Sequence, residues 1–218
     1  MAGEEGSAAG RRAQFQGVLQ LRDEDESPRL KAQSSVESTD EQEPFMGVKM
    51  RRRSSMYRHY KGDYLDVSSN DRIQKLLMKQ GDREVLFAEN LVKVTRRRKL
   101  LRRLLLITDV AVYILETQFY NLKRRISLQS INKVCLSEQS DNFFAIIVPS
   151  EYDTLLASTR KNEIVTVLVE ASKKLSESGE PMEVQFADKF EYYLDSEHIR
   201  EVITEQVTGG VKTIFVDT

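Results

Sequence analysis

The sequence predicts a mainly β protein with helices, of the α+β class, built as an antiparallel barrel or sandwich with one capping amphipathic helix and extra terminal strands. First, short runs rich in Val, Ile, Leu and Phe recur about every ten residues between polar breaks, which is typical of antiparallel sheets. Second, apolar residues in 160–176 fall three and four positions apart, which indicates one helical face. Third, Gly179 and Pro181 end that pattern, and short apolar runs resume after them.

The N-terminal segment 1–44 is expected to be disordered and acidic. It is rich in Gly, Ser, Ala, Glu and Asp and has little aliphatic clustering, so it cannot bury enough apolar surface to form a core. Its apolar residues could support at most a transient helix over 13–21. The folded domain is therefore expected to occupy 45–218.

That domain is expected to have three parts: lead-in helices at 45–82, a core at 83–178 and additional strands at 179–218. A short helix is predicted over 71–78. The lead-in is basic and aromatic, and its tyrosines are expected to pack on the core: Tyr57, Tyr60 and Tyr64.

Core strands are predicted at 84–94, 104–108, 110–116, 125–128, 133–136, 143–148 and 154–157. The helix follows at 160–176, and further strands are predicted at 182–186, 190–194 and 211–216. Several phenylalanines follow the strand alternation and are expected in the core: Phe143, Phe144, Phe186 and Phe190. A run of short strands closed by one amphipathic helix is the element order of a pleckstrin-homology-like barrel.

The net charge of −1 hides a strong polarity along the chain. Segment 1–44 carries five basic and ten acidic side chains, and segment 136–218 carries seven and sixteen. Segment 45–135 carries twenty-one basic and eight acidic side chains, a net charge of +13. A middle third this basic is expected to attract a polyanion, such as phospholipid headgroups or nucleic acid.

The sharpest signal is a basic cluster that straddles the predicted turn between the first two core strands. It comprises Lys93, Arg96, Arg97, Arg98, Lys99, Arg102 and Arg103. Side chains of a hairpin turn point to solvent, and the flanking Lys93 and Arg103 can face one another across the strand pair. A compact ammonium and a forked guanidinium together suit a phosphate group.

Two other interpretations of the cluster remain open. The first is a solvated charged face without a binding role. Such faces normally contain both acidic and basic residues, whereas no acidic residue occurs between Glu89 and Asp109. A nuclear localisation signal or a nucleic-acid-binding patch is the other. Nucleic-acid binding is not expected, because the aromatic residues lie in strand patterns and not between the cations, where bases could stack on them.

Two smaller basic clusters accompany the first. Lys123, Arg124 and Arg125 are expected to extend it as a secondary basic face, because neighbouring loops of a barrel open on a shared end. Arginines at 51–53 precede Ser54 and Ser55, a pattern that basophilic kinases favour. Phosphorylation there is expected to weaken attraction to an anionic membrane by cancelling positive charge.

Several segments, in the same order along the chain, resemble the tail homology domain of class I myosins. They are YKGDYLDV (60–67), EVLFAENLVKV (84–94), LLLITDVAVYIL (104–115), LKRRISLQSINKVCLS (122–137), DNFFAIIVP (141–149), LLASTRKNEIVTVL (155–168) and VQFADKFEYYL (184–194). The resemblance covers roughly 48–216. It implies a pleckstrin-homology-like fold that binds anionic phospholipids, particularly phosphatidylinositol bisphosphate, with Lys93 and Arg103 where the headgroup ligands of the family lie.

The chain departs from the family pattern in two ways. It shows no motor head, no phosphate-binding glycine loop and no light-chain-binding helix, so force generation is not carried over. The loop at 95–102 lacks the glycine and aromatic residue usual in the family and has four consecutive basic residues instead.

No residue pattern indicates an enzyme, a cofactor or a metal site. Cys135 is the only cysteine and sits in an apolar strand pattern, so a buried thiol in a reducing compartment is expected. The two histidines, His59 and His198, lie far apart without a cysteine partner. No run approaches the roughly 20 apolar residues of a membrane-spanning helix, so any membrane contact is expected to be peripheral.

These observations predict a monomeric, non-catalytic module at the cytosolic face of the plasma membrane or an endomembrane. Lys93 and Arg103 are expected to contact lipid phosphate, while Arg96 to Lys99 and Arg102 supply delocalised attraction. The alternative is a protein-interaction module that binds an acidic partner or the actin and myosin cytoskeleton without recognising lipid.

Overall fold

The structure is a computed structural model that describes residues 61–177 and 179–217, together with three short N-terminal strands at 14–16, 18–19 and 30–31. Most of the segment that was expected to be disordered, 1–44, therefore lies outside the described residues. So do Tyr57, Tyr60, Ser54, Ser55 and His59. The described parts of 13–21 form strands β1 (Gln14–Gln16) and β2 (Val18–Leu19) instead of the helix suggested there.

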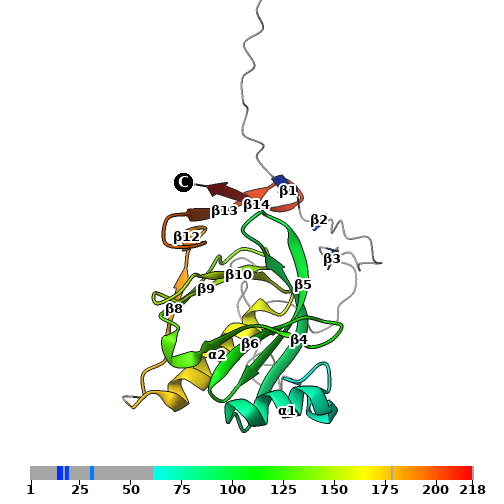
Figure 1. Ribbon diagram of the computed structural model, residues 1–218. Helices are drawn as coiled ribbons and strands as arrows, with labels where there is room; N and C mark the ends of the chain where they lie inside the picture. Colours follow the sequence, from blue (N-terminus) through cyan, green and yellow to red (C-terminus); the bar gives the residue numbers. More distant parts are fainter. Residues whose placement is uncertain (1–13, 17, 20–29, 32–60, 178, 218) are drawn as a thin grey trace, which may run out of the picture.

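The main sheet has eight strands in the order β11-β8-β9-β10-β4-β5-β6-β7 (Figure 1). They are β4 (Val85–Val94), β5 (Leu100–Thr108), β6 (Ala111–Leu115), β7 (Leu122–Ser127), β8 (Lys133–Leu136), β9 (Phe143–Ile147), β10 (Thr154–Ala157) and β11 (Glu183–Phe186). Pairing is antiparallel except between β11 and β8. The sheet ends at β7 and β11, so it is an open, sandwich-like sheet and not a closed barrel.

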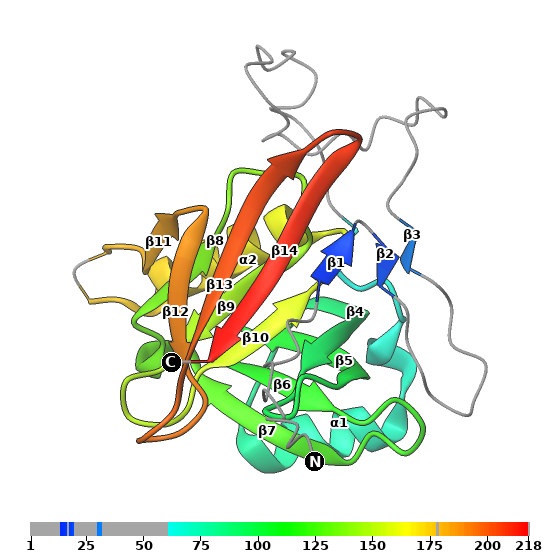
Figure 2. The ribbon, with the colours of Figure 1, turned by 90° about the horizontal axis from the view of Figure 1, so that it is seen from above.

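A second sheet has the order β1-β14-β13-β12, with β12 (Lys189–Tyr193), β13 (Ile199–Val207) and β14 (Gly210–Asp217). We call β12–β14 the C-terminal sheet. It lies over β8 and β9, whereas β5–β7 lie to its side (Figure 2). Strand β2 pairs with β3 (Leu30–Lys31) in a separate two-stranded ribbon.

The helices occupy the positions that the sequence predicts. Helix α1 (Asp71–Gln80) begins at Asn70, whose side chain accepts hydrogen bonds from the backbone N–H groups of Arg72 and Ile73. Helix α2 (Lys161–Leu175) follows β10 directly. Among the described residues there are also two short 3₁₀ helices, η2 (Val67–Ser69) before α1 and η3 (Leu128–Ser130) after β7. Strands β4–β10 followed by α2 form the predicted pleckstrin-homology-like core.

Three hydrophobic cores hold these layers together, because the main sheet is covered on both faces. The inner core lies between the sheet and α2 and includes Phe87, Leu91, Leu105, Ile164 and Leu168. The outer core lies between β4–β6 and α1, and includes Ile73, Leu77, Leu104 and Tyr113. The third core joins the main sheet to the C-terminal sheet, and includes Val92, Phe143, Phe190, Val202 and Phe215.

The lead-in packs on the core through Tyr64, as the sequence predicts. Its hydroxyl donates to Glu163 Oε2 of α2 at 2.8 Å, and its ring meets that of Phe87 edge-on at 5.9 Å. The guanidinium of Arg160 lies 4.0 Å from the centre of the Tyr64 ring and pairs with Glu89 of β4 at 3.2 Å. The segment before α1 is thereby fixed against both β4 and α2.

Three strands differ from the sequence prediction, and one of them, β7, begins three residues before its predicted start at 125. Strand β5 begins at Leu100, four residues before the predicted start, since Arg102 and Arg103 interrupt its apolar run. No element is predicted over Ile199–Val207, where β13 lies, because Arg200 and Glu201 hide the alternation. In the structure Arg200 and Glu201 are buried, and each forms an ion pair with a neighbouring strand. Phe186, expected in the core, is 43% exposed at the end of β11.

Gly62 marks a close approach between the lead-in and β4. Its φ is +73°, and a Cβ atom there would lie 2.6 Å from the carbonyl oxygen of Leu86. Its own carbonyl accepts a hydrogen bond from the N–H of Ala88 at 3.0 Å. Gly81, which ends α1, also has a positive φ of +81° but has no neighbouring atom within 4 Å of an added Cβ.

We expect Gly62→Ala to lower the free energy of unfolding more than Gly81→Ala does. The left-handed conformation costs about 1–2 kcal/mol at either position, and overpacking against Leu86 adds about 1–3 kcal/mol at Gly62 alone. Urea denaturation of the two variants measures the difference. Equal losses would show that the lead-in does not approach β4 this closely.

Candidate anion-binding site

The basic cluster lies on a tight hairpin, as the sequence predicts. The turn between β4 and β5 is closed by a hydrogen bond from the N–H of Thr95 to the carbonyl of Lys99 at 2.8 Å, and by one from the N–H of Arg98 to the carbonyl of Thr95 at 2.9 Å. The Thr95 hydroxyl also accepts from the N–H of Lys99 at 2.9 Å. Arg98 has a φ of +60°, which a turn of this shape requires. We call residues 95–99 the basic loop.

Lys93 and Arg103 do not lie directly opposite one another, so that part of the prediction is wrong. The pairing sets Lys93 against Leu101 and Arg103 against Leu91. The five-residue turn causes this offset, because it sets Val94 against Leu100 as the last pair before the loop. Lys93 and Arg103 are therefore diagonal neighbours on the same face of the hairpin, the face that carries Leu91 and Leu105 into the inner core.

Lys93 is half-buried among other cations. Its Nζ lies 5.4 Å from the centre of the Tyr152 ring, which comes from the turn between β9 and β10. Burial, and then repulsion by the guanidinium groups of Arg124 and Arg103, lower the pKa of the Lys93 ammonium to about 8. An anion bound at this position would offset both effects.

Arg124 is not part of an exposed basic face, which corrects the sequence prediction. Its side chain is 4% exposed and its guanidinium stacks on the Tyr152 ring at 3.8 Å. It donates to the hydroxyl of Thr154, to the Tyr152 carbonyl at 2.5 Å and to Glu151 Oε2 at 3.0 Å. Arg124 thus ties β7 to the β9–β10 turn and places Tyr152 beside Lys93.

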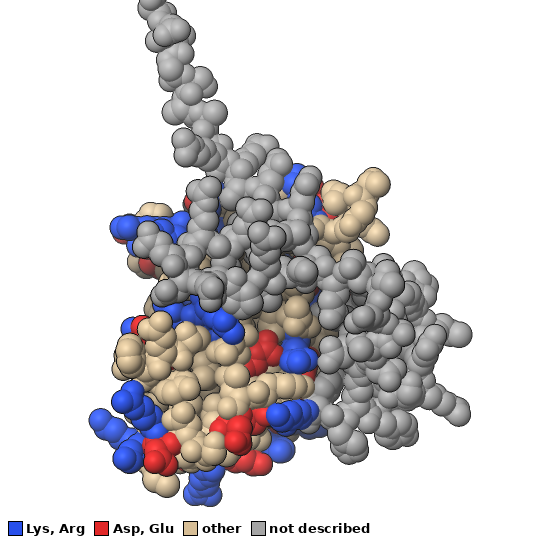
Figure 3. Space-filling model, turned by 90° about the vertical axis from the view of Figure 1, so that its right-hand side faces the viewer, with Lys and Arg blue, Asp and Glu red and all other residues tan. Residues whose placement is uncertain are grey.

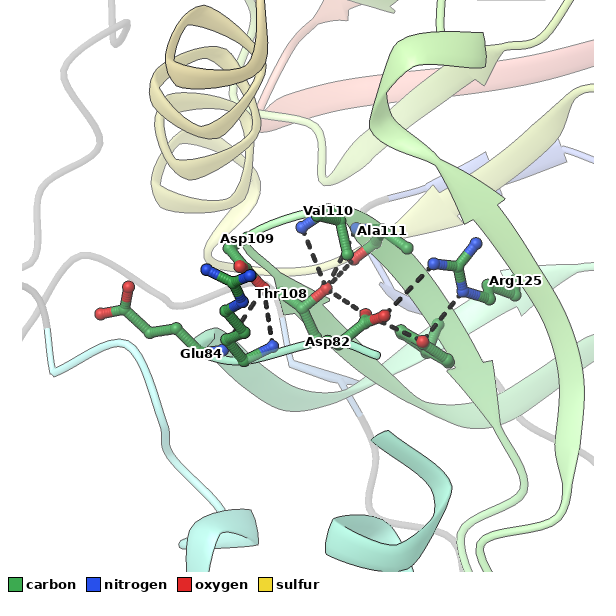
Figure 4. Close-up of polar contacts among 9 residues, drawn as sticks. Asp82, Glu84, Thr108, Asp109, Val110, Ala111 and Arg125 are labelled. Carbon is green, nitrogen blue, oxygen red and sulfur yellow. Dashed lines mark hydrogen bonds and ion pairs between the residues drawn. The ribbon is translucent and has the colours of Figure 1, made fainter. Parts of the chain in front are cut away.

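Arg125 also has a structural role. It points to the other face of β7, where its Nη2 lies 3.2 Å from Asp82 Oδ1 and its Nε donates to the Tyr113 hydroxyl at 2.9 Å (Figure 4). The buried Asp82 carboxylate also accepts from Tyr113 at 2.8 Å and from Thr108 at 2.6 Å. Of the predicted secondary basic face, only Lys123 is exposed, and it pairs with Glu116 at 3.6 Å.

Two cations of the basic loop are matched by the C-terminal sheet, although the sequence predicts that all of them face solvent alone. Arg96 Nη1 lies 2.7 Å from Asp195 Oδ2, and Arg98 Nη2 lies 2.5 Å from Asp217 Oδ2. Asp195 also meets His198 at 2.7 Å. The His198 hydrogen bond, together with nearby backbone N–H groups and Arg96, lowers the pKa of Asp195 to about 2.

A buried arginine holds the basic loop against the C-terminal sheet. Arg200 of β13 is 2% exposed and donates to the carbonyl oxygens of Thr95 at 3.3 Å and Arg96 at 2.7 Å. It also donates to Asp217 at 2.5 Å and to the Tyr192 hydroxyl at 3.3 Å. Sequence analysis missed Arg200, Tyr152 and the role of Arg124, because each acts on a segment far away in the chain.

The remaining cations face solvent. Arg97, Lys99 and Arg102 are exposed, Arg103 is half-exposed, and neither they nor Lys93 form an ion pair within the described part of the chain. Figure 3 shows one face of the molecule, on which Lys and Arg side chains lie interspersed with Asp and Glu. Five cations without an ion pair among the described residues thus lie where β4, β5 and their turn meet the β9–β10 turn.

The structure also places the other candidate features, which are the single cysteine, possible metal ligands and possible membrane-spanning helices. Cys135 is buried, and burial raises the pKa of its thiol to about 11, well above that of a reactive thiolate. Within the described residues, no group of three or more His, Cys, Asp or Glu side chains is arranged to hold a metal ion. Among those same residues, no helix is both long and apolar enough to cross a membrane.

By its fold, the protein is a mainly β module of pleckstrin-homology type with an added C-terminal sheet. A family model described as "Unconventional myosin tail, actin- and lipid-binding" matches residues 51–216. The chain therefore belongs to this family, the tail homology domain of class I myosins, as the resemblance implied.

Relatives in the family are much longer myosins. The chain is 32% identical to the myosin IB heavy chain of Dictyostelium discoideum over 72% of its length, and 36% identical to the myosin heavy chain IB of Acanthamoeba castellanii over 67%. It is 25% identical to unconventional myosin-Ib of Mus musculus over 73%. The chain spans 15%, 13% and 15% of the length of these relatives, respectively.

Solved structures with a similar fold are more distant. The hSac2 domain of the human phosphoinositide phosphatase Sac2 is 12% identical, with a TM-score of 0.38 over 55% of this chain and 90% of its own. The N-terminal PH domain of human ARAP2 is 20% identical, with a TM-score of 0.35 over 42% of this chain and 82% of its own.

We expect Arg200→Met to destabilise the protein by about 1–3 kcal/mol, because it leaves the carbonyls of Thr95 and Arg96 without their buried donor. Hydrogen exchange of the amides in 95–99 should accelerate as the loop loosens. Lys123→Met, which removes the more exposed ion pair to Glu116, is the control and should cost less than about 1 kcal/mol. Unchanged exchange in Arg200→Met would mean that Arg200 does not hold the loop.

We expect Lys93→Met to raise the free energy of unfolding at pH 7. A lysine with a pKa near 8 in the folded state and 10.5 in the unfolded state binds fewer protons when folded between these values. Its contribution therefore destabilises the fold fully below pH 8, and that penalty is relieved as pH rises toward 10.5. Denaturation at pH 7 and pH 10 should show a gain for Lys93→Met that shrinks with pH; a loss at pH 7 would contradict the buried-cation environment.

Proposed function

We propose that the protein is a non-catalytic peripheral membrane module that binds anionic phospholipid headgroups at Lys93 and Arg103. It acts as a monomer at a cytosolic membrane face. Phosphatidylinositol bisphosphate is the headgroup that suits the site best, because the ammonium of Lys93 and the fork of Arg103 can each hold a different phosphate.

The observation that carries this proposal is a pair of cations without a matching carboxylate. Near Lys93 and Arg103, Glu151 pairs with Arg124 and Glu116 pairs with Lys123, and Glu116 also attracts Arg103 without forming an ion pair with it. Burial, and then this surplus of positive charge, lowers the pKa of Lys93. A bound phosphate would reduce the repulsion among Lys93, Arg103 and Arg124, so the folded protein is prepared for an anion.

The basic loop contributes long-range attraction. Arg97, Lys99 and Arg102 are exposed and flank the cation pair, and each cation near an anionic leaflet contributes about 1 kcal/mol. Arg96 and Arg98 contribute less, because Asp195 and Asp217 offset their charges. The orientation of the loop is fixed by Arg200, so these cations need little ordering when they meet a surface.

We expect the double variant Lys93→Ala with Arg103→Ala to bind vesicles about 30-fold more weakly than the wild type, from two contributions of about 1 kcal/mol. The measurement is cosedimentation with phosphatidylcholine vesicles containing phosphatidylserine and phosphatidylinositol bisphosphate. The matched control, Arg72→Ala with Lys79→Ala, removes the same charge from exposed positions on α1 and should change affinity less than about threefold.

Two outcomes would contradict the proposal. Equal binding by the wild type and the double variant would remove Lys93 and Arg103 from the site. Failure of the wild type to bind any anionic vesicle, together with sedimentation with actin filaments, would favour a protein-interaction module instead.

A further inference from the structure

The turn between β6 and β7 presents an aromatic ring near the cation pair. Leu104 of β5 pairs with Leu115 of β6, so the turn begins directly beside Arg103. Phe119, within the turn, is 59% exposed, and Leu122, which follows it, is 39% exposed. An aromatic and an aliphatic side chain thus face outward at the end of the sheet that carries the unmatched cations.

The turn itself is well fixed. The N–H of Glu116 donates to the carbonyl of Asn121 at 3.0 Å, and the N–H of Tyr120 donates to the carbonyl of Glu116 at 3.1 Å. The side-chain amide of Asn121 donates to Glu116 Oε2 at 2.8 Å. Tyr120 has a φ of +56° and packs against the outer core. Tyr120 therefore takes the inward position, and Phe119 projects outward on a rigid support.

The surroundings of Phe119 decide which partner its ring suits. A single exposed apolar side chain is common on protein surfaces and indicates nothing alone. The strands next to the turn carry three cations, Arg102 and Arg103 on β5 and Lys123 on β7, and of these Lys123 pairs with Glu116 in the turn. An exposed apolar side chain beside positive charge matches the layering of a bilayer surface, where anionic headgroups lie above hydrocarbon. Tyr152, 39% exposed at the same rim, suits the headgroup level.

We propose that the β6–β7 turn inserts Phe119 into the apolar layer of an anionic membrane while Lys93 and Arg103 hold lipid phosphate. This inference rests on the proposed function and adds a second point of contact to it. A soluble inositol phosphate engages the cation pair alone, whereas a bilayer engages both the cation pair and Phe119. Membrane binding is therefore stronger than headgroup binding, and the difference depends on Phe119.

The full chain allows a direct test, because it contains no tryptophan. The variant Phe119→Trp provides one fluorophore at the tip of the turn. We expect its emission to shift to shorter wavelength on phosphatidylcholine vesicles that contain phosphatidylserine and phosphatidylinositol bisphosphate, and brominated acyl chains to quench it. Met78→Trp is the matched control, since Met78 is 75% exposed on α1, and its emission should stay unchanged.

A second variant measures the contribution of the ring. We expect Phe119→Ser to bind the same vesicles about 5- to 20-fold more weakly, from the loss of the apolar area still exposed in the free protein. Its affinity for soluble inositol trisphosphate should equal that of the wild type, which shows that the cation pair is intact.

The outcomes separate this inference from the proposed function. Vesicle binding by Phe119→Trp without a shift or quenching, or equal vesicle affinity of Phe119→Ser and the wild type, overturns the insertion and leaves headgroup binding standing. A shift of Phe119→Trp emission on actin filaments but not on vesicles assigns the ring to a protein contact and also overturns it. Absence of binding to both vesicles and inositol trisphosphate by the wild type overturns both proposals.

Discussion

The main physical constraint on this protein is that its central sheet is covered on both faces. Strands β4–β6 bury one face against α2 and the other against α1, and β8–β10 bury their outer face against the C-terminal sheet. Alternate side chains of one strand therefore enter different cores, and the strands read as continuous apolar runs. Exposed charged side chains can therefore cluster where strands end, and the β4–β5 turn is such a place.

The seven cations at this turn have three different environments. Arg96 and Arg98 join the hairpin to Asp195 and Asp217 of the C-terminal region. Arg97, Lys99 and Arg102 are exposed to solvent. The diagonal pair Lys93 and Arg103 is partly buried. Under the proposed function, these environments correspond to support, attraction and recognition. Lys93 would then combine a cost in stability with a gain in binding, since the burial that lowers its pKa also makes a phosphate partner favourable.

Much of the fold was predictable from local patterns, because most strands and both α-helices have a clear apolar period. The basic hairpin was also predictable, since its cations interrupt an apolar run. What could not be predicted depends on long-range pairing. The offset of Lys93 and Arg103 follows from the length of the β4–β5 turn. The burial of Arg124 follows from its hydrogen bonds to the β9–β10 turn. Strand β13 can contain Arg200 because this side chain pairs with Asp217 on β14. A charged residue within a strand gives no signal of the partner that will neutralise it.

The contact of Arg200 with the loop carbonyls has a mechanical consequence. The hairpin tip and β14 share this guanidinium through Thr95, Arg96 and Asp217, so a pull on either segment is transmitted to the other. A load on the hairpin tip would pass along β13 and β14, across interstrand hydrogen bonds that run perpendicular to the strands, before it reached the hydrophobic interior. The C-terminal sheet thereby braces the hairpin tip.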